Sequence, residues 1–81
     1  MEQYKLGNWI VEIYERENDT FRVISDDEEM VILDNDKDMI ALFSIGENGN
    51  IYLEKTTWNS VIEFAFEEKK IVFSLEEETE F

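Results

Sequence analysis

Apolar and polar side chains alternate along most of this chain, and a period of two is typical of half-buried β-strands. In the first such run, residues 9–16, Trp9, Val11 and Ile13 share one face and polar side chains occupy most of the other. Two later runs, 30–33 and 39–45, are nearly continuously apolar, which is typical of central strands covered on both faces. The remaining predicted strands span 20–25, 51–56 and 71–75. The pattern therefore predicts an all-β protein.

Residues with turn propensity separate these runs. Asn18-Asp19 tolerates positive φ and predicts a tight hairpin between 9–16 and 20–25. A two-residue loop there would set Glu15 opposite Arg22 and Ile13 opposite Ile24, which is a charge pair and an apolar pair.

A second hairpin is predicted at Asn48-Gly49, between the runs 39–45 and 51–56, because Asn-Gly favours the type I′ turn. Two further connections are strongly acidic: Asp26 to Glu29, and Asp34 to Asp38.

Residues 57–70 fit two patterns. As a short helix near 57–69, the segment would begin with a capping box at Ser60 to Glu63. As a strand, it places Ile62, Phe64 and Phe66 on one face, and a turn at 67–70 brings them against the apolar face of 71–75. The strand interpretation is favoured because it buries Phe64 and agrees with β-propensity.

The predicted architecture is one domain over residues 1–75, followed by an acidic C-terminal tail, 76–81. Short connections between six or seven strands favour an antiparallel meander, closed into a partial barrel or folded as a two-layer sandwich. The chain has no proline and three glycines, and no linker divides it.

The net charge is the feature of the sequence that bears most on function. The 81 residues include 21 acidic and 7 basic side chains and no histidine, a net charge of -14. The apolar content of 43% argues against disorder. Solubility of a small domain needs a net charge of only about 2 to 8. The surplus favours an electropositive partner, and its sign argues against direct binding of nucleic acid or anionic membranes.

Candidate chemistry is sparse, and the expectation is a protein that is not an enzyme and uses no cofactor. Neither histidine nor cysteine is present to activate a nucleophile. Asp34, Asp36 and Asp38 match the first three ligand positions of a calcium loop. Met39 stands at the sixth position, where glycine belongs, and Ile45 at the twelfth, where glutamate belongs, so no metal site is predicted.

The candidate partner-binding residues come from the acidic connections and from two tyrosines. If 34–38 is extended, its alternate carboxylates lie about 6.6 to 6.8 Å apart and match every second phosphate of a DNA strand, which advances about 3.4 Å per phosphate. Two tyrosines share strand faces with charged residues and are candidates for exposed hot spots in an acidic rim. The predicted set is Asp26, Asp27, Glu28, Glu29, Asp34, Asp36, Asp38, Tyr14 and Tyr52.

These features predict a non-enzymatic inhibitor that occupies the basic, nucleic-acid-binding surface of a nuclease-like partner. In composition alone, the chain resembles DNA mimics and phage counter-defence proteins, which are small, acidic and free of cysteine. Two alternatives stay open: an immunity protein that neutralises a cationic toxin, and a structural or assembly protein, such as a homo-oligomer, whose charge only confers solubility. Without a signal-peptide pattern or an apolar run of about 20 residues, a cytoplasmic location is expected.

Overall fold

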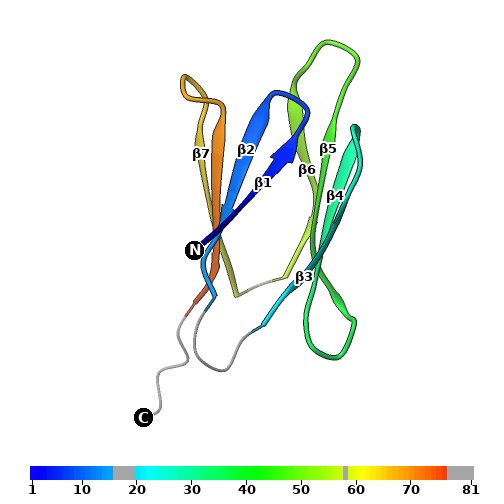
Figure 1. Cartoon of the computed structure of the whole chain (residues 1–81), viewed down its shortest axis with the longest axis vertical. Coiled ribbons are helices and arrows are strands. Elements are labelled where there is room, and N and C mark those ends of the chain that lie inside the picture. The colour runs from blue at the N-terminus through cyan, green and yellow to red at the C-terminus, as the bar shows by residue number, and fades with distance from the viewer. Residues whose placement is uncertain (16–19, 58, 77–81) are drawn as a thin grey trace.

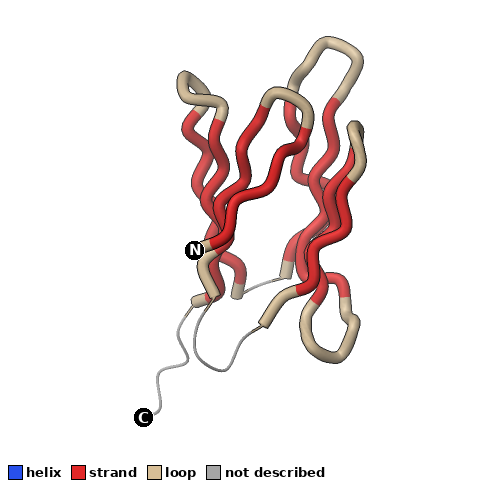
Figure 2. Tube along the Cα trace, viewed as in Figure 1, coloured by secondary structure: helices blue, strands red, loops and turns tan. Residues whose placement is uncertain are grey.

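A computed structural model of the chain describes residues 1–15, 20–57 and 59–76. The described residues form eight strands and no helix, and the strands make two four-stranded sheets that pack face to face (Figures 1 and 2). The all-β prediction is confirmed, and of the two predicted architectures the two-layer sandwich is the one observed. The strands are β1 (Glu2–Leu6), β2 (Trp9–Ile13), β3 (Arg22–Ser25), β4 (Glu29–Leu33), β5 (Met39–Ile45), β6 (Ile51–Thr56), β7 (Ser60–Ala65) and β8 (Lys70–Leu75).

The first sheet has the order β1-β2-β8-β7, and the second has the order β3-β4-β5-β6. Their facing sides form one apolar core, because alternate residues of each strand point inward. Phe43 from the second sheet and Phe73 from the first are fully buried there. The other buried apolar residues are Leu6, Trp9, Val11, Ile13, Met30, Ile32, Ile40, Ala41 and Ile71.

The predicted hairpin between 9–16 and 20–25 is wrong, although Asn18-Asp19 itself lies outside the described residues. The neighbours of β2 are β1 and β8, whereas β3 pairs only with β4 in the other sheet. Both sides of β2, whose Val11 and Ile13 are at most 1% exposed, are occupied by β1 and β8, whereas β3 is largely exposed and suits a sheet edge.

The chain therefore departs from a purely antiparallel meander at one place. After β2 it crosses to the second sheet, runs through four strands, and returns as the β7–β8 hairpin. An even number of strand reversals leaves β8 running parallel to β2, with Val11 beside Ile71 and Ile13 beside Phe73. The other pairs are antiparallel.

The strand β1 was not predicted from the sequence, and it raises the count from the expected six or seven to eight. It pairs with β2 through the two-residue loop Gly7-Asn8, with Leu6 opposite Trp9. Gly7 has a positive φ of 59°, and a Cβ atom there would lie 2.5 Å from Cδ1 of Ile45. Glycine thus lets this loop pack directly against the second sheet.

In residues 59–75 the strand interpretation is confirmed, and the alternative of a short helix near 57–69 is wrong for the described residues. Ile62 pairs with Phe73 and Phe64 with Ile71, as expected from a turn at 67–70. The stacked rings of Phe64 and Phe66, 5.6 Å apart, extend this apolar face. Residues 77–81 of the predicted tail lie outside the described residues.

Strand direction gives the sandwich two distinct ends. One, the hairpin end, carries the four turns that join β1 to β2, β3 to β4, β5 to β6 and β7 to β8 (upper edge of Figure 1). The other, the crossover end, carries the β4–β5 turn and the described residues of the two crossing segments between the sheets, 14–15, 20–21, 57 and 59 (lower edge of Figure 1). The candidate residues divide between these ends.

Candidate protein-interaction surface

The β4–β5 turn at the crossover end is held in shape by its own first residue. Oδ1 of Asp34 accepts the backbone N–H groups of Asp36 and Asp38, each at 2.9 Å. The backbone N–H of Lys37 donates to the carbonyl of Asp34 at 3.1 Å, and Lys37 adopts a positive φ of 65°. Aspartate is suited to such a turn because its short side chain satisfies nearby backbone donors.

This geometry overturns the expectation of an extended, phosphate-spaced row. One carboxylate oxygen from each of Asp34, Asp36 and Asp38 lies within 4.8 Å of the other two. The three charges converge on one point instead of tracking a strand. Such a cluster suits a single cation, either a hard metal ion with ligand distances of about 2.3–2.6 Å or the charged end of a basic side chain.

A hollow of about 350 Å³ adjoins this turn. It lies where the turn meets the two crossing segments, and Asp34 and Asp36 form part of its wall while Asp38 does not. Thr20 and Thr57 contribute from the crossing segments. None of the non-acidic residues around it was predicted from the sequence, because they come from four separate segments and carry no motif.

The second predicted acidic connection forms the β3–β4 turn at the hairpin end. Oδ1 of Asp26 accepts the backbone N–H groups of Glu28 and Glu29, both at 2.8 Å. These two hydrogen bonds stabilise the charged form and lower the pKa of Asp26 from its ordinary value of 3.8. The β5–β6 and β7–β8 turns add Glu47, Glu67 and Glu68 at the same end.

The two tyrosines are far apart. Tyr52 lies on the outer face of the second sheet, in a row with Ser44 and Glu29, and is 46% exposed. Tyr14 follows β2 at the crossover end and is 45% exposed. The structure thus places Tyr52 beside one acidic turn and Tyr14 at the end that carries the other.

The two acidic turns are themselves separated by the length of β4, which is about 17 Å for five extended residues. The predicted residues consequently form two sites at opposite ends of the sandwich. A partner that contacts both would have to span the second sheet.

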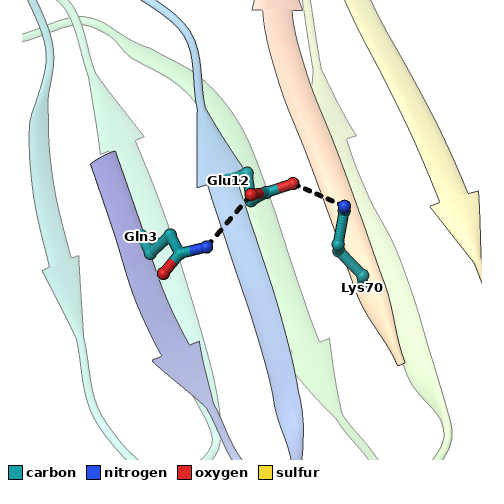
Figure 3. Close-up of polar contacts among 3 residues, drawn as sticks. All are labelled: Gln3, Glu12 and Lys70. Atoms are coloured by element: carbon teal, nitrogen blue, oxygen red, sulfur yellow. Dashed lines mark hydrogen bonds and ion pairs between the residues drawn. The ribbon is translucent and has the colours of Figure 1, made fainter. Parts of the chain in front are cut away.

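One charged group missed by the sequence analysis lies on the outer face of the first sheet. Glu12 is only 6% exposed, and its carboxylate accepts a hydrogen bond from Gln3 at 3.0 Å and forms an ion pair with Lys70 at 2.8 Å (Figure 3). The contacts to Lys70 and Gln3 lower the pKa of Glu12, and the same carboxylate raises that of Lys70. This group joins β1, β2 and β8, and its role is structural.

A second missed group is the phenol of Tyr4 in β1. It donates a hydrogen bond to the Glu2 carboxylate. That hydrogen bond, with burial and the nearby charges of Glu2 and Glu15, raises the pKa of Tyr4 to about 12.

No helix among the described residues is long and apolar enough to cross a membrane. Comparison with protein-family models, with curated proteins and with solved structures finds no significant match to this chain.

Proposed function

We propose that this protein is a non-enzymatic inhibitor that occupies the basic, nucleic-acid-binding surface of a partner protein, with the crossover end as its contact. The observation that carries the proposal is the convergence of Asp34, Asp36 and Asp38 within 4.8 Å on a turn fixed by its own backbone. Between described residues there is one ion pair, Lys70–Glu12, so none of these three aspartates is paired with a described lysine or arginine.

Such a cluster is unfavourable in the isolated protein. Two like charges about 4 Å apart repel by about 1 kcal/mol in water. A basic side chain of a partner would relieve this repulsion and form charge-assisted hydrogen bonds. Because natural proteins often lose stability at functional positions, a self-repelling cluster of this kind supports a binding role.

The rest of the charge supports a basic surface as the target. Beside the cluster, the crossover end carries the described acids Glu2, Glu15 and Glu76. Complementary potential accelerates association and makes it sensitive to salt. Surfaces that bind nucleic acid through phosphate contacts supply the required lysines and arginines. The partner is expected in a reducing compartment such as the cytoplasm, which suits a chain without cysteine.

The test is competition with duplex DNA. Proteins captured on the immobilised chain at about 50 mM salt and retained at about 150 mM are identified and purified, a range in which phosphate-type contacts weaken strongly. Each is then bound to a fluorescent duplex and titrated with the chain. We expect at least one basic partner to release its duplex as the chain binds.

Two charge-matched variants locate the contact. D34N/D36N/D38N removes three charges from the crossover end, and its asparagines can still accept the backbone hydrogen bonds of the turn. D27N/E28Q/E29Q removes three charges from the hairpin end and leaves Asp26 in place. The first variant should associate at least about tenfold more slowly and the second much less.

Three outcomes would contradict the proposal. Retention of no protein at about 150 mM salt would leave the chain without a specific basic partner. Simultaneous binding of duplex and chain to the same partner would separate the contact from the nucleic-acid surface. Equal effects of the two variants would show that net charge, and no particular end, attracts the partner.

A further inference from the structure

The hollow at the crossover end has a composition that the proposed function leaves unexplained. Its volume of about 350 Å³ lies at the small end of the range for ligand sites, about 300–1,000 Å³, and suits one side chain better than a larger ligand. It borders the acidic β4–β5 turn, which lies at the lower right of Figure 1.

One wall is acidic. Asp34 and Asp36 line the hollow. Oδ1 of Asp34 is occupied by the two backbone N–H groups of the turn, whereas Oδ2 of Asp34 and both oxygens of Asp36 accept no hydrogen bond from a described residue. These three acceptor oxygens suit the fork of donors on a guanidinium group.

Part of the lining is apolar. It is formed by Phe21, Ile40 and Leu75, which come from the crossing segment, β5 and β8. The rings of Phe21 and Phe73 of the core pack edge to face, with their centroids 5.8 Å apart and an angle of 78° between the ring planes. An aromatic ring and aliphatic carbons can pack against the three-carbon stem of an arginine, and a ring face attracts its planar cation.

The remaining lining side chains are polar and form hydrogen bonds with one another. Oγ1 of Thr57 donates to Oδ1 of Asn59 at 2.8 Å, and Thr20 donates to Oδ1 of Asn35. The hydrogen bonds orient these side chains before any ligand arrives. A pre-ordered wall lowers the entropic cost of binding.

We propose that this hollow is the binding site for an arginine side chain presented by the partner, with its guanidinium against Asp34 and Asp36 and its stem against Phe21. The inference rests on the proposed function and deepens it, since it names the group that the crossover end recognises. It favours arginine over lysine because a planar, five-donor cation uses both the carboxylates and the ring, whereas an ammonium is a point charge.

The experiment titrates the ¹⁵N-labelled chain with Nα-acetyl-arginine amide, with Nα-acetyl-lysine amide, and with calcium chloride, all at constant ionic strength. Arginine amide should move the backbone signals of 20, 34–36, 57 and 59, with a dissociation constant on the order of 1 to 10 mM. Lysine amide should bind about fivefold more weakly.

Paired variants separate the hollow from the general field of charge. D36N and D38N each remove one carboxylate from the same turn, but only Asp36 lines the hollow. D36N should weaken arginine binding by about tenfold and D38N by about twofold or less. T20L narrows the hollow without changing the net charge and should weaken binding, whereas T56L makes the same change at an exposed position outside it.

Equal effects of D36N and D38N, or equal binding of arginine and lysine amides with signals spread over both ends, would overturn the inference. So would a response to calcium alone, which would make the turn a metal site. If T20L does not fold, the comparison of D36N with D38N still tests whether arginine binds in the hollow. The two proposals fail separately. If a partner releases its duplex but arginine amide does not bind in the hollow, only the arginine site is refuted. If arginine amide binds but no partner releases its duplex, the inhibitor function is refuted.

Discussion

Removing the repulsion within the β4–β5 turn should make the protein more stable. In D36N/D38N every charge pair of the cluster is lost, while Asp34 keeps its charge and the two backbone hydrogen bonds that shape the turn. The same change removes part of the proposed contact, so stability and partner binding should move in opposite directions.

The magnitude follows from the spacing. Two charges 4.8 Å apart repel by about 0.9 kcal/mol in water, so three pairs give about 2.6 kcal/mol. At 0.1 M salt, with a Debye length of about 10 Å, roughly 60% of this remains. The unfolded chain keeps some of the same repulsion because the residues are close in sequence. The expected gain is therefore about 1 kcal/mol.

Urea denaturation of the two proteins at low salt and at 1 M sodium chloride measures this gain. It should fall below about 0.5 kcal/mol at 1 M salt, where the Debye length is about 3 Å. The control E47Q/E63Q also removes two charges, from the β5–β6 turn and from β7. If D36N/D38N is no more stable than this control at low salt, or if its gain does not depend on salt, the repulsion inferred from the turn is wrong.

Three further predictions concern the scaffold. Because hydrogen bonding to a carboxylate raises the pKa of Tyr4 to about 12, ultraviolet titration should lose its latest phenolate step in Y4F, and an unchanged curve would refute the contact. The lowered pKa of Glu12 implies a contribution to stability that is complete above its ordinary pKa of 4.5 and is lost as the pH falls through its folded value. The free energy of unfolding of E12Q should therefore depend less on pH in acid. The raised pKa of Lys70 implies that the contribution of the same ion pair is also lost as the pH rises above 10.5. Gly7→Ala should lower the free energy of unfolding by about 2–3 kcal/mol, because of the positive φ and the overlap of the new Cβ with Ile45. In the I45V background, which lacks Cδ1, about half of this loss should be recovered. Equal losses in both backgrounds would place the strain in the backbone alone.

The local parts of this fold could be predicted because they depend on neighbours in sequence. Alternation located β4 through β6 and β8 to within a few residues, and Asn48-Gly49 marked the β5–β6 turn. The strand β1 was overlooked, although Gly7-Asn8 between Leu6 and Trp9 is a recognisable two-residue hairpin loop.

The candidate site could be predicted only in part. Both acidic connections are turns, as their composition indicates, and Tyr14 and Tyr52 are exposed. The sequence could not say that Asp34 folds its carboxylate back onto the turn, since an extended row and a tight cluster have the same residues. The hollow beside it gave no signal at all, because Thr20, Phe21 and Thr57 are far apart in the sequence and come together only in the folded protein.

The sequence by itself determined the strands, the turns and the sign of the charge, because side-chain periodicity and turn propensity act over a few residues. Only the tertiary structure decided which strands pair beyond those joined by a short predicted turn, such as β5 with β6. β2 lies between β1 and β8, and β8 pairs with it in parallel from the far end of the chain, which no local pattern indicates. The strand arrangement also places the two acidic turns at opposite ends of the sandwich. One of these turns, in which three carboxylates converge, lies beside a partly apolar hollow.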